Sequence, residues 1–331
     1  MTESKRYLCV DIGGTAVKTG LLTGNGEILT TREDPAPRGA EALLSLVENV
    51  AEKFSLEISN GQLGGKSDKI FHGGKFDVFH ALCVSTAGIV DPWRGEILPD
   101  SGTAVGDYGG LPLRAELQKR AGLPVEVEND VNCALLGESW RGAARGFRNA
   151  ACITVGTGIG GAFMIDGRLY RGTRFDAMEV GHIPFFPSNW ENRASTQALA
   201  CACAKLAGHF PTDSPPDLNG RLIVERAREG NKTALRAVDE LCFYLAQGIA
   251  TLFAVLAPDV FVVGGGIAQS QDLLRPRIDA CLERTLAPRF REKIALRFAE
   301  LGNSAGLVGA LKHFMDMQKT GKRSMKEGEK S

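Results

Sequence analysis

Short apolar runs separated by glycine turns open this chain. Three such runs lie between residues 6 and 33, joined first by Asp11-Ile12-Gly13-Gly14-Thr15 and then by Gly24-Asn25-Gly26. Runs of this length bounded by glycine predict β-strands, and Gly24-Asn25-Gly26 predicts a tight hairpin. Over residues 40–54 the apolar positions instead recur three and four apart, which predicts a helix.

Strand and helix patterns then alternate along the chain. Strands are expected over 77–84, 124–128, 150–165 (two strands around a turn), 259–267 and 294–298, and helices over 113–121, 132–140, 234–256 and 305–317. Residues 59–75 are rich in Gly, Lys and Ser, which predicts a mobile loop. Residues 318–331 are rich in Lys, Glu and Ser, which predicts a disordered tail.

A second glycine turn, Gly156-Thr157-Gly158-Ile159-Gly160-Gly161, follows the first after about 145 residues and also joins two apolar runs. Such turns expose backbone N–H groups that suit phosphate oxygens. A Rossmann glycine turn opens a helix, whereas these turns open strands, and the turn of 156–161 lacks the Gly-Lys-Ser/Thr ending of a P-loop. The repeated opening predicts two related α/β lobes with a cleft between them, in an actin-like (ribonuclease-H-like) ATPase fold. We expect a small N-terminal lobe over 1–125 and a large C-terminal lobe over 126–304, with the helix of 305–317 returning to the first lobe.

Composition argues against several classes of protein. The 331 residues carry 39 Lys and Arg against 39 Asp and Glu, a balance that gives no electrostatic basis for binding nucleic acid or an anionic membrane. The most apolar long stretch, 249–263, is interrupted by Pro258-Asp259 and is too short to cross a bilayer. No apolar leader precedes the first strand, and several of the eight cysteines lie in apolar segments, so a reduced, cytoplasmic protein is expected.

Glu128-Asn129-Asp130, at the end of an expected strand, is the sharpest candidate for catalysis. Phosphoryl transfer to a sugar hydroxyl needs a carboxylate that accepts the hydroxyl proton, and an adjacent Asn can bind a neighbouring hydroxyl. The alternative is that Asn129 or Asp130 only caps the following helix. Asp11 could hold a Mg²⁺-bound water or orient the attacking group. The alternative is that Asp11 only caps the backbone amides of the turn.

Further polar groups lie in the second half of the chain. Glu179, His182 and Glu191 occupy one segment flanked by apolar residues, and jointly they could bind a polyhydroxylated ligand. Taken singly, a structural histidine and a surface carboxylate explain them as well. Gly264-Gly265-Gly266 ends an expected strand and adds a third glycine run to the two phosphate turns.

Together these motifs resemble the ROK family (repressors, open reading frames and kinases) of bacterial sugar kinases. The resemblance covers about residues 6–315 and rests on the order and spacing of Asp11-Ile12-Gly13-Gly14-Thr15 with Lys18, Ser85-Thr86-Ala87-Gly88-Ile89-Val90-Asp91, Glu128-Asn129-Asp130-Val131-Asn132, the turn of 156–161, Glu179-Val180-Gly181-His182 and Gly264-Gly265-Gly266-Ile267. It implies an ATP-dependent hexose kinase that acts on the 6-hydroxyl with Mg²⁺, and a homodimer. Carried over by motif, the general base is Asp130, the sugar-binding residues are Gly88, Asn129, Glu179, His182 and Glu191, and the ATP-binding residues are Asp11, Gly13, Gly14, Thr15, Lys18, Thr157, Gly158 and Gly265.

One departure from the family pattern concerns zinc. Family members usually carry a zinc site built from a histidine and a Cys-x-Cys-Gly-x-x-Gly-Cys stretch, whereas residues 183–190 here contain no cysteine. Cys201 and Cys203 lie on an expected helix, where residues two apart do not share a face. We therefore expect no zinc site, with His182 free to contact sugar and with Phe185, Phe186 and Trp190 packing the loop.

The other departure concerns the sugar. Many relatives carry an Asn-Leu-x-x-Trp stretch whose Asn contacts the sugar, whereas residues 100–110 here have a different, glycine-containing sequence. The zinc-less pattern resembles some N-acetylmannosamine kinases and β-glucoside kinases, so the expected acceptor is a hexose of the glucose or N-acetylmannosamine type, with a β-glucoside as the alternative. The family's repressors carry an additional N-terminal helix-turn-helix domain, for which the residues before Tyr7 leave no room. A sugar-responsive regulator is thus the weaker alternative.

Overall fold

The computed structural model describes residues 5–63, 75–99, 108–208 and 219–328, with side chains as far as 320. The chain divides into two units. The first comprises residues 1–141, 172–175 and 304–331, and the second comprises residues 142–171 and 176–303.

The first unit is built on a five-stranded sheet of order β3-β2-β1-β4-β7. Strands β1, β2 and β3 are antiparallel neighbours, while β1, β4 and β7 are parallel. The elements are β1 (Arg6–Ile12), β2 (Ala16–Thr23), β3 (Ile28–Pro35), α1 (Ala40–Ser59), β4 (Leu82–Thr86), β5 (Val90–Asp91), β6 (Glu96–Ile97), α2 (Leu113–Ala121), β7 (Val125–Asn129), α3 (Asp130–Arg141) and α10 (Ala305–Gly328). In register, Ile12 of β1 lies opposite Thr86 of β4, which lies opposite Asn129 of β7, so these three strands end at one edge of the sheet.

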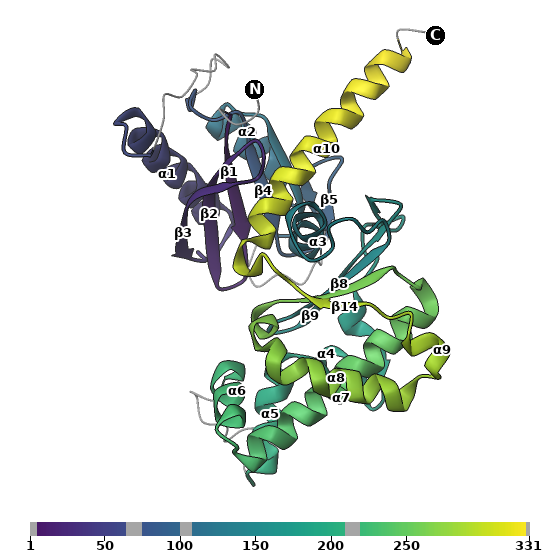
Figure 1. The fold of residues 1–331 in the computed structure, drawn as a ribbon. Helices are drawn as coiled ribbons and strands as arrows, with labels where there is room; N and C mark the ends of the chain where they lie inside the picture. The colour runs from purple at the N-terminus through teal and green to yellow at the C-terminus, as the bar shows by residue number, and fades with distance from the viewer. Residues whose placement is uncertain (1–4, 64–74, 100–107, 209–218, 329–331) are drawn as a thin grey trace. The chain divides into compact units, whose positions relative to one another are not determined.

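Helices cover both faces of this sheet (Figure 1). On one face the core buries Leu8 and Ile12 of β1 with Phe54 of α1 and Leu117 of α2. On the other face α10 contacts β1, β4 and β7 and packs against α3. Helix α10 therefore runs directly behind the strand ends that carry the predicted chemistry.

The second unit repeats this plan. Its sheet has the order β10-β9-β8-β13-β14, with β8 antiparallel to β9 and parallel to β13, which is parallel to β14. The elements are β8 (Ala150–Val155), β9 (Ile159–Ile165), β10 (Arg168–Leu169), η1 (Val180–His182), β11 (Pro184–Phe185), β12 (Ser188–Asn189), α4 (Glu191–Ala194), α5 (Thr196–Leu206), α6 (Gly220–Arg228), α7 (Lys232–Leu256), β13 (Val260–Gly264), η3 (Gly266–Ser270), α8 (Gln271–Thr285), α9 (Pro288–Arg291) and β14 (Leu296–Phe298), and the turn η4 (Gly302–Ser304) precedes α10. The predicted duplication of an α/β lobe is present.

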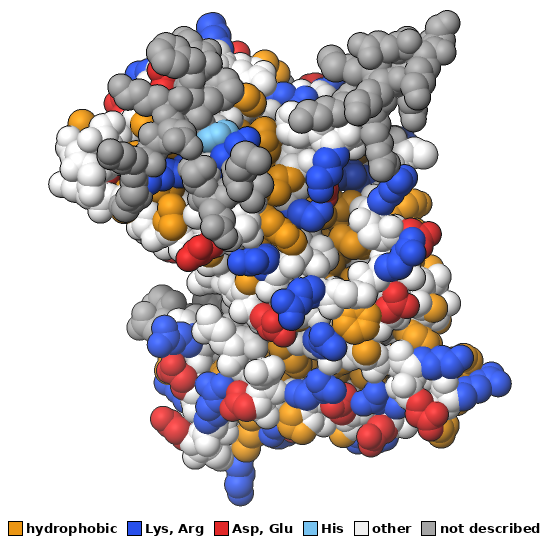
Figure 2. Space-filling view, turned by 45° about the horizontal axis from the view of Figure 1, so that its top comes forward, with side chains coloured by type: hydrophobic (Ala, Val, Ile, Leu, Met, Phe, Trp, Pro, Cys, Tyr) orange, Lys and Arg blue, Asp and Glu red, His pale blue; other side chains and the backbone are white. Residues whose placement is uncertain are grey.

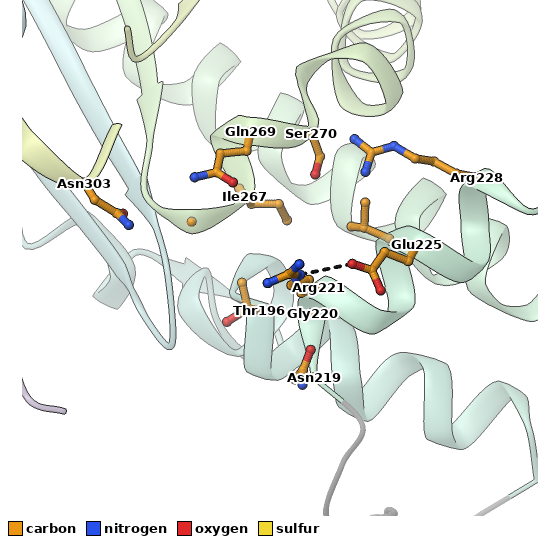
Figure 3. Close-up of a pocket in the computed structure, with 12 residues that line it drawn as sticks. Thr196, Asn219, Gly220, Arg221, Glu225, Arg228, Ile267, Gln269, Ser270 and Asn303 are labelled. Carbon is orange, nitrogen blue, oxygen red and sulfur yellow. Dashed lines mark hydrogen bonds and ion pairs between the residues drawn. The ribbon is translucent and has the colours of Figure 1, made fainter. Parts of the chain in front are cut away.

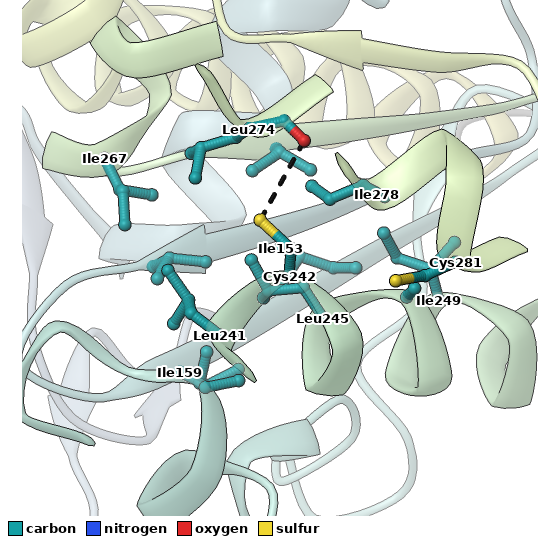
Figure 4. Close-up of a cluster of buried hydrophobic side chains, with 14 of the residues drawn as sticks. Ile153, Ile159, Leu241, Cys242, Leu245, Ile249, Ile267, Leu274, Ile278 and Cys281 are labelled. Atoms are coloured by element: carbon teal, nitrogen blue, oxygen red, sulfur yellow. Dashed lines mark hydrogen bonds between the residues drawn. The ribbon is translucent and has the colours of Figure 1, made fainter. Parts of the chain in front are cut away.

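The core of the second unit lies between its sheet and helices α7 and α8 (Figure 4). Ile153 of β8 is packed there with Leu245 of α7 and Ile278 of α8, all fully buried. By length and composition alone, the 25 residues of α7 could span a membrane, and this helix begins before the apolar stretch of 249–263. Because 56% of its most apolar window is buried in the unit, α7 has the character of a core helix.

Several boundaries differ from the sequence prediction. Strand β4 begins at Leu82 rather than at 77, and α10 continues to Gly328, where a disordered tail was expected from 318. The first unit extends to Arg141 instead of 125, because β7 pairs with β4 and α3 packs against α10. Most of the predicted loop of 59–75 lies outside the described residues, and its first residue, Ser59, is the last of α1.

Charged side chains of opposite sign lie close together on the second unit. Ion pairs join Arg228 to Asp272, Arg277 to Asp239 and Arg291 to Asp279. In the lower half of the face drawn in Figure 2, Lys and Arg side chains accordingly lie beside Asp and Glu side chains. Surface pairs of this kind contribute little to stability, and they reduce the local field that would attract a polyanion.

Candidate active site

The first glycine turn joins β1 to β2 and presents Asp11. Lys18 lies directly opposite Asp11 in the β1–β2 register, and Asp11 Oδ1 accepts a 2.6 Å hydrogen bond from Ser85 Oγ of β4. At the tip of the turn Gly14 and Thr15 are exposed, while Gly13 donates its N–H to Ala16. The predicted ATP-binding residues of this turn therefore lie together.

Asp11 lies in a partly desolvated position. Burial raises the pKa of its carboxyl above the ordinary range, opposed by the Ser85 hydrogen bond and by the charge of Lys18. The start of α10 is close beside it, since a Cβ added at Gly306 would lie 2.6 Å from Asp11 Cγ. Holding this carboxylate ionised therefore costs folding free energy that a neutral side chain would not cost.

Asp11→Asn is accordingly expected to stabilise the protein above the titration range. A raised folded-state pKa means that the ionised group lowers stability once the pH exceeds that pKa, and that the penalty vanishes below the unfolded-state value of about 3.9. We expect the melting temperature of the variant to exceed that of the wild type by about 2 °C or more at pH 8, with the difference shrinking as the pH falls toward 4. Calorimetry across this range measures it, and a variant that melts lower than the wild type at pH 8 would contradict the assigned environment.

Asn129 and Asp130 stand where β7 passes into α3. Asn129 Nδ2 donates to the carbonyl oxygen of Gly88 at 3.0 Å and to Asp130 Oδ1 at 2.9 Å. Asn129 Oδ1 accepts the N–H groups of Val131 and Asn132, both at 3.0 Å, so Asn129 does cap α3, one of the two predicted alternatives. Gly88 has a φ of 102°, a conformation that favours glycine. The predicted sugar-binding residues of the first unit thus meet at the proposed base.

Two buried residues near the Asn129–Asp130 turn were not predicted from the sequence as site residues. Tyr108 and Thr86, both fully buried, share a 2.7 Å hydrogen bond between their hydroxyls. Burial raises the pKa of Tyr108, and the charge of Asp130 adds to the increase. Tyr108 lies at the end of the 100–110 segment in which the family pattern is lost, and residues 100–107 of that segment lie outside the described residues.

The second glycine turn, between β8 and β9, is held by residues of α4 and α5. Glu191 Oε2 accepts the N–H of Ile159 at 3.0 Å, and a Cβ at Gly158 would lie only 2.2 Å from that oxygen. Thr196 donates to the carbonyl oxygen of Gly156 through its N–H at 2.8 Å and through Oγ1 at 2.7 Å. Thr157 of this turn is exposed. Glu191, which is predicted to bind sugar, is therefore in direct contact with a turn that is predicted to bind phosphate.

Gly265 lies beside the same turn. It follows β13, the parallel neighbour of β8, with a φ of 81°. A Cβ there would lie 2.4 Å from the carbonyl oxygen of Val155, the last residue of β8. Only glycine allows this approach, which brings the third glycine run against the second.

Glu179 and His182 flank the short helix η1. Both residues are exposed. Partial desolvation is nevertheless the main cause that raises the pKa of the Glu179 carboxyl. The charges of Asp176 and Glu191 raise it further, and His182 lowers it. The charges of His182 and Glu191 thus act on the carboxyl of Glu179.

A pocket of about 570 Å³ opens on the second unit (Figure 3). Helix α6, the turn η3 and the start of α5 enclose it, and its volume lies in the usual range for small-molecule sites. It is lined by Thr196, Asn219, Gly220, Arg221, Val224, Glu225, Arg228, Gly266, Ile267, Gln269, Ser270 and Asn303. None of its polar side chains was predicted from the sequence, because segments far apart in the chain assemble it.

Comparisons with known proteins decide the family. The model of the ROK family matches residues 71–316, well over half of the chain. The chain belongs to the ROK family. A glucokinase from Streptomyces coelicolor is 32% identical over 91% of this chain and 95% of its own length, and a β-glucoside kinase from Klebsiella pneumoniae is 30% identical over 94% and 96%. The crystal structure of a ROK family glucokinase from Streptomyces griseus in complex with glucose and AMPPNP is 30% identical, with a TM-score of 0.73 over 92% of this chain and 98% of that one.

These matches confirm two sequence predictions. The chain is a sugar kinase of the ROK family, and its two five-stranded sheets have the fold of ROK kinase structures. Relatives of nearly equal identity carry different sugar names, so the family does not define the acceptor.

The loop that replaces the usual ROK zinc stretch is packed by aromatic rings. Trp190 is fully buried, stacks on Phe185 with a centroid separation of 6.1 Å and donates Nε1–H to the carbonyl oxygen of Tyr244 at 2.9 Å. Gly248 of α7 makes room for it, since a Cβ there would lie 1.9 Å from the indole. The prediction that Phe186 also packs this loop is wrong, because Phe186 is 96% exposed at the hairpin tip between β11 and β12.

We predict that the purified protein binds no stoichiometric zinc. In α5, Cys201 is exposed whereas Cys203 is buried, so the two thiols do not converge. Within the described residues no group of three or more His, Cys, Asp or Glu side chains could hold a metal ion. Elemental analysis of protein purified without chelator measures the zinc content, and one zinc per chain would refute the prediction.

The first unit offers a partner for Mg²⁺. Mg²⁺ in phosphoryl-transfer enzymes is commonly held by one or two carboxylates together with substrate phosphates and water. Asp11 is a carboxylate at the predicted phosphate turn, so the side chain suits this role, directly or through a water. Bound there, Mg²⁺ would neutralise phosphate charge.

Proposed function

We propose that this ROK-family sugar kinase transfers the γ-phosphoryl group of ATP to the 6-hydroxyl of a hexose, with Asp130 as the general base. The observation that carries the proposal is the position of Asp130, the first residue of α3, at the strand-end edge beside Asn129 and Gly88. A sugar hydroxyl within hydrogen-bond distance of Asp130 would give its proton to the carboxylate as its oxygen bonds to phosphorus and ADP leaves.

The remaining roles follow the family motifs. Asn129 and Gly88 would bind neighbouring sugar hydroxyls in the first unit, and Glu179, His182 and Glu191 would do so in the second. The ATP-binding residues would be Asp11, Gly13, Gly14, Thr15 and Lys18 of the first unit and Thr157, Gly158 and Gly265 of the second. The pocket beside Gly266 suits the nucleoside of ATP by its size and its mixed polar and apolar lining.

The proposed acceptor is glucose or N-acetylmannosamine. A β-glucoside is the second candidate, favoured by the zinc-less loop and by the β-glucoside kinase among the relatives. Because closely related sugars differ by single hydroxyl or acetyl groups, contacts within the pocket decide among them rather than the motifs. We also propose a cytoplasmic homodimer, and light scattering of the purified chain would test the dimer.

A coupled ADP-release assay tests the proposal. Glucose, mannose, fructose, N-acetylglucosamine, N-acetylmannosamine and a β-glucoside are each supplied with ATP and Mg²⁺, and ATP alone is the control. We expect sugar-dependent ADP release with glucose or N-acetylmannosamine. Release with the β-glucoside alone would favour the second candidate, and no release above the control with any sugar would contradict the proposed activity.

A further inference from the structure

A buried histidine of the C-terminal helix lies behind the proposed base. His313 of α10 is 2% exposed, and Glu128, at the end of β7, is fully buried. His313 Nδ1 is 3.6 Å from Glu128 Oε2, within ion-pair distance. We propose that His313 is a positioning residue of the kinase reaction, which acts through Glu128 to hold the Asn129–Asp130 turn in its catalytic geometry. The proposal rests on the function proposed above for Asp130.

Glu128 links the histidine to the turn. Its Oε1 accepts the N–H of Asn129 at 2.9 Å and Asn132 Nδ2 at 3.0 Å. These two hydrogen bonds lie on either side of Asp130 in the sequence, one before it and one after it. A shift of the Glu128 carboxylate would therefore move the backbone that carries the proposed base, and small displacements of a catalytic group strongly reduce the rate.

The burial of Glu128 explains why a histidine at position 313 would stabilise it. A carboxylate taken fully out of water needs donors or positive charge around it, and a histidine side chain supplies an N–H donor or, when protonated, a charge. Residues 305–314 of α10 are otherwise largely apolar where they meet the sheet, with Leu307, Val308 and Leu311 buried. A polar ring at 313, facing a buried carboxylate, stands out from this apolar surface.

Helix α10 is also anchored close to the turn. A Cβ at Gly309 would lie 1.7 Å from the carbonyl oxygen of Cys133 in α3, so the two helices approach to backbone contact. The same helix begins beside Asp11 at Gly306. One rigid helix thus contacts both the phosphate turn and, through His313, the residue that supports the proposed base.

The test compares two substitutions at one position. His313→Leu places an apolar side chain of similar size at this position and removes the donor, whereas His313→Asn can place an amide nitrogen near the position of Nδ1. We expect His313→Leu to lower kcat about 10- to 100-fold with KM for ATP nearly unchanged, and His313→Asn to recover most of kcat. His80→Leu is the matched control, because His80 precedes the start of β4, away from Glu128, where its ring centroid lies 5.6 Å from that of Tyr7. This variant should keep kcat near the wild-type value.

Three results would overturn the proposal. These are a folded His313→Leu variant with wild-type kcat, an Asn variant as impaired as the Leu variant, and a loss of kcat in His80→Leu equal to that in His313→Leu. Should His313→Leu fail to fold, Glu128→Gln decides in its place, with a lowered kcat expected and wild-type kcat contradicting the proposal. Wild type and Asp130→Asn are assayed alongside. If the wild type shows no sugar-dependent turnover, the proposed function itself fails. If the wild type is active, Asp130→Asn is inactive and His313→Leu keeps the wild-type kcat, only the positioning role is rejected.

Discussion

Asp130→Asn is expected to lower kcat by about 10²- to 10⁴-fold while leaving the fold intact. An amide cannot accept the proton of the sugar hydroxyl, so the attacking oxygen would have to lose it to water. The substitution keeps an oxygen in the position from which Asp130 Oδ1 accepts the N–H of Val131 at 2.9 Å, and the start of α3 should therefore survive. Steady-state kinetics and a thermal melt of the same sample measure both properties.

Asp166→Asn provides the matched control. Asp166 is also an aspartate, but it pairs with Arg148 at 3.1 Å, and its side chain is 70% exposed. The control should keep kcat within about twofold of the wild type, since an exposed pair contributes little. If Asp130→Asn retained a substantial part of the wild-type turnover, or if it lost activity only because it unfolded, Asp130 could not be assigned as the base.

The second large effect concerns stability. Gly309→Ala should lower the free energy of unfolding by about 3 kcal/mol or more, because the new Cβ would lie 1.7 Å from the carbonyl oxygen and 2.4 Å from the carbonyl carbon of Cys133. These are backbone atoms of α3, and they cannot rotate away as a side chain could. Helices α3 and α10 would have to separate, and the support of the Asn129–Asp130 turn would move with them.

Urea or thermal unfolding measures this loss, with Gly266→Ala as the control. Gly266 has no atom within 4 Å of the position that a Cβ would take, and it starts the turn η3. That substitution should leave the stability unchanged within about 0.5 kcal/mol. A Gly309→Ala protein as stable as the control would mean that the two helices do not pack this closely.

Local patterns predicted most of the fold. The β1–β2–β3 hairpins, helix α2 and the strand pair β8–β9 were placed within a few residues, because glycine turns and apolar periodicity are local signals. The duplicated plan followed from the repetition of the strand–turn–strand opening. The boundary between the units was misplaced because β7 belongs to the first sheet through its pairing with β4, a contact that no local pattern contains.

The positions of the candidate site residues were predicted in part for the same reason. Asp11, Asn129 and Asp130 stand at strand ends, where the sequence signal is strong, and the structure places them at one edge of the sheet. Tyr108 and His313 carry no such signal. Each contacts a residue far away in sequence, Thr86 and Glu128 respectively, and only the folded chain brings these pairs together.

The position of phosphate on the product tests the central claim most directly. Phosphorus NMR of the reaction mixture, with coupling to the sugar protons, identifies the hydroxyl that has been phosphorylated, and the same sample gives the ratio of ADP to sugar phosphate. We predict a hexose 6-phosphate formed in equal amount with ADP by the wild type and nearly absent with Asp130→Asn. Phosphate on another carbon, or ADP accompanied only by inorganic phosphate, would contradict the account.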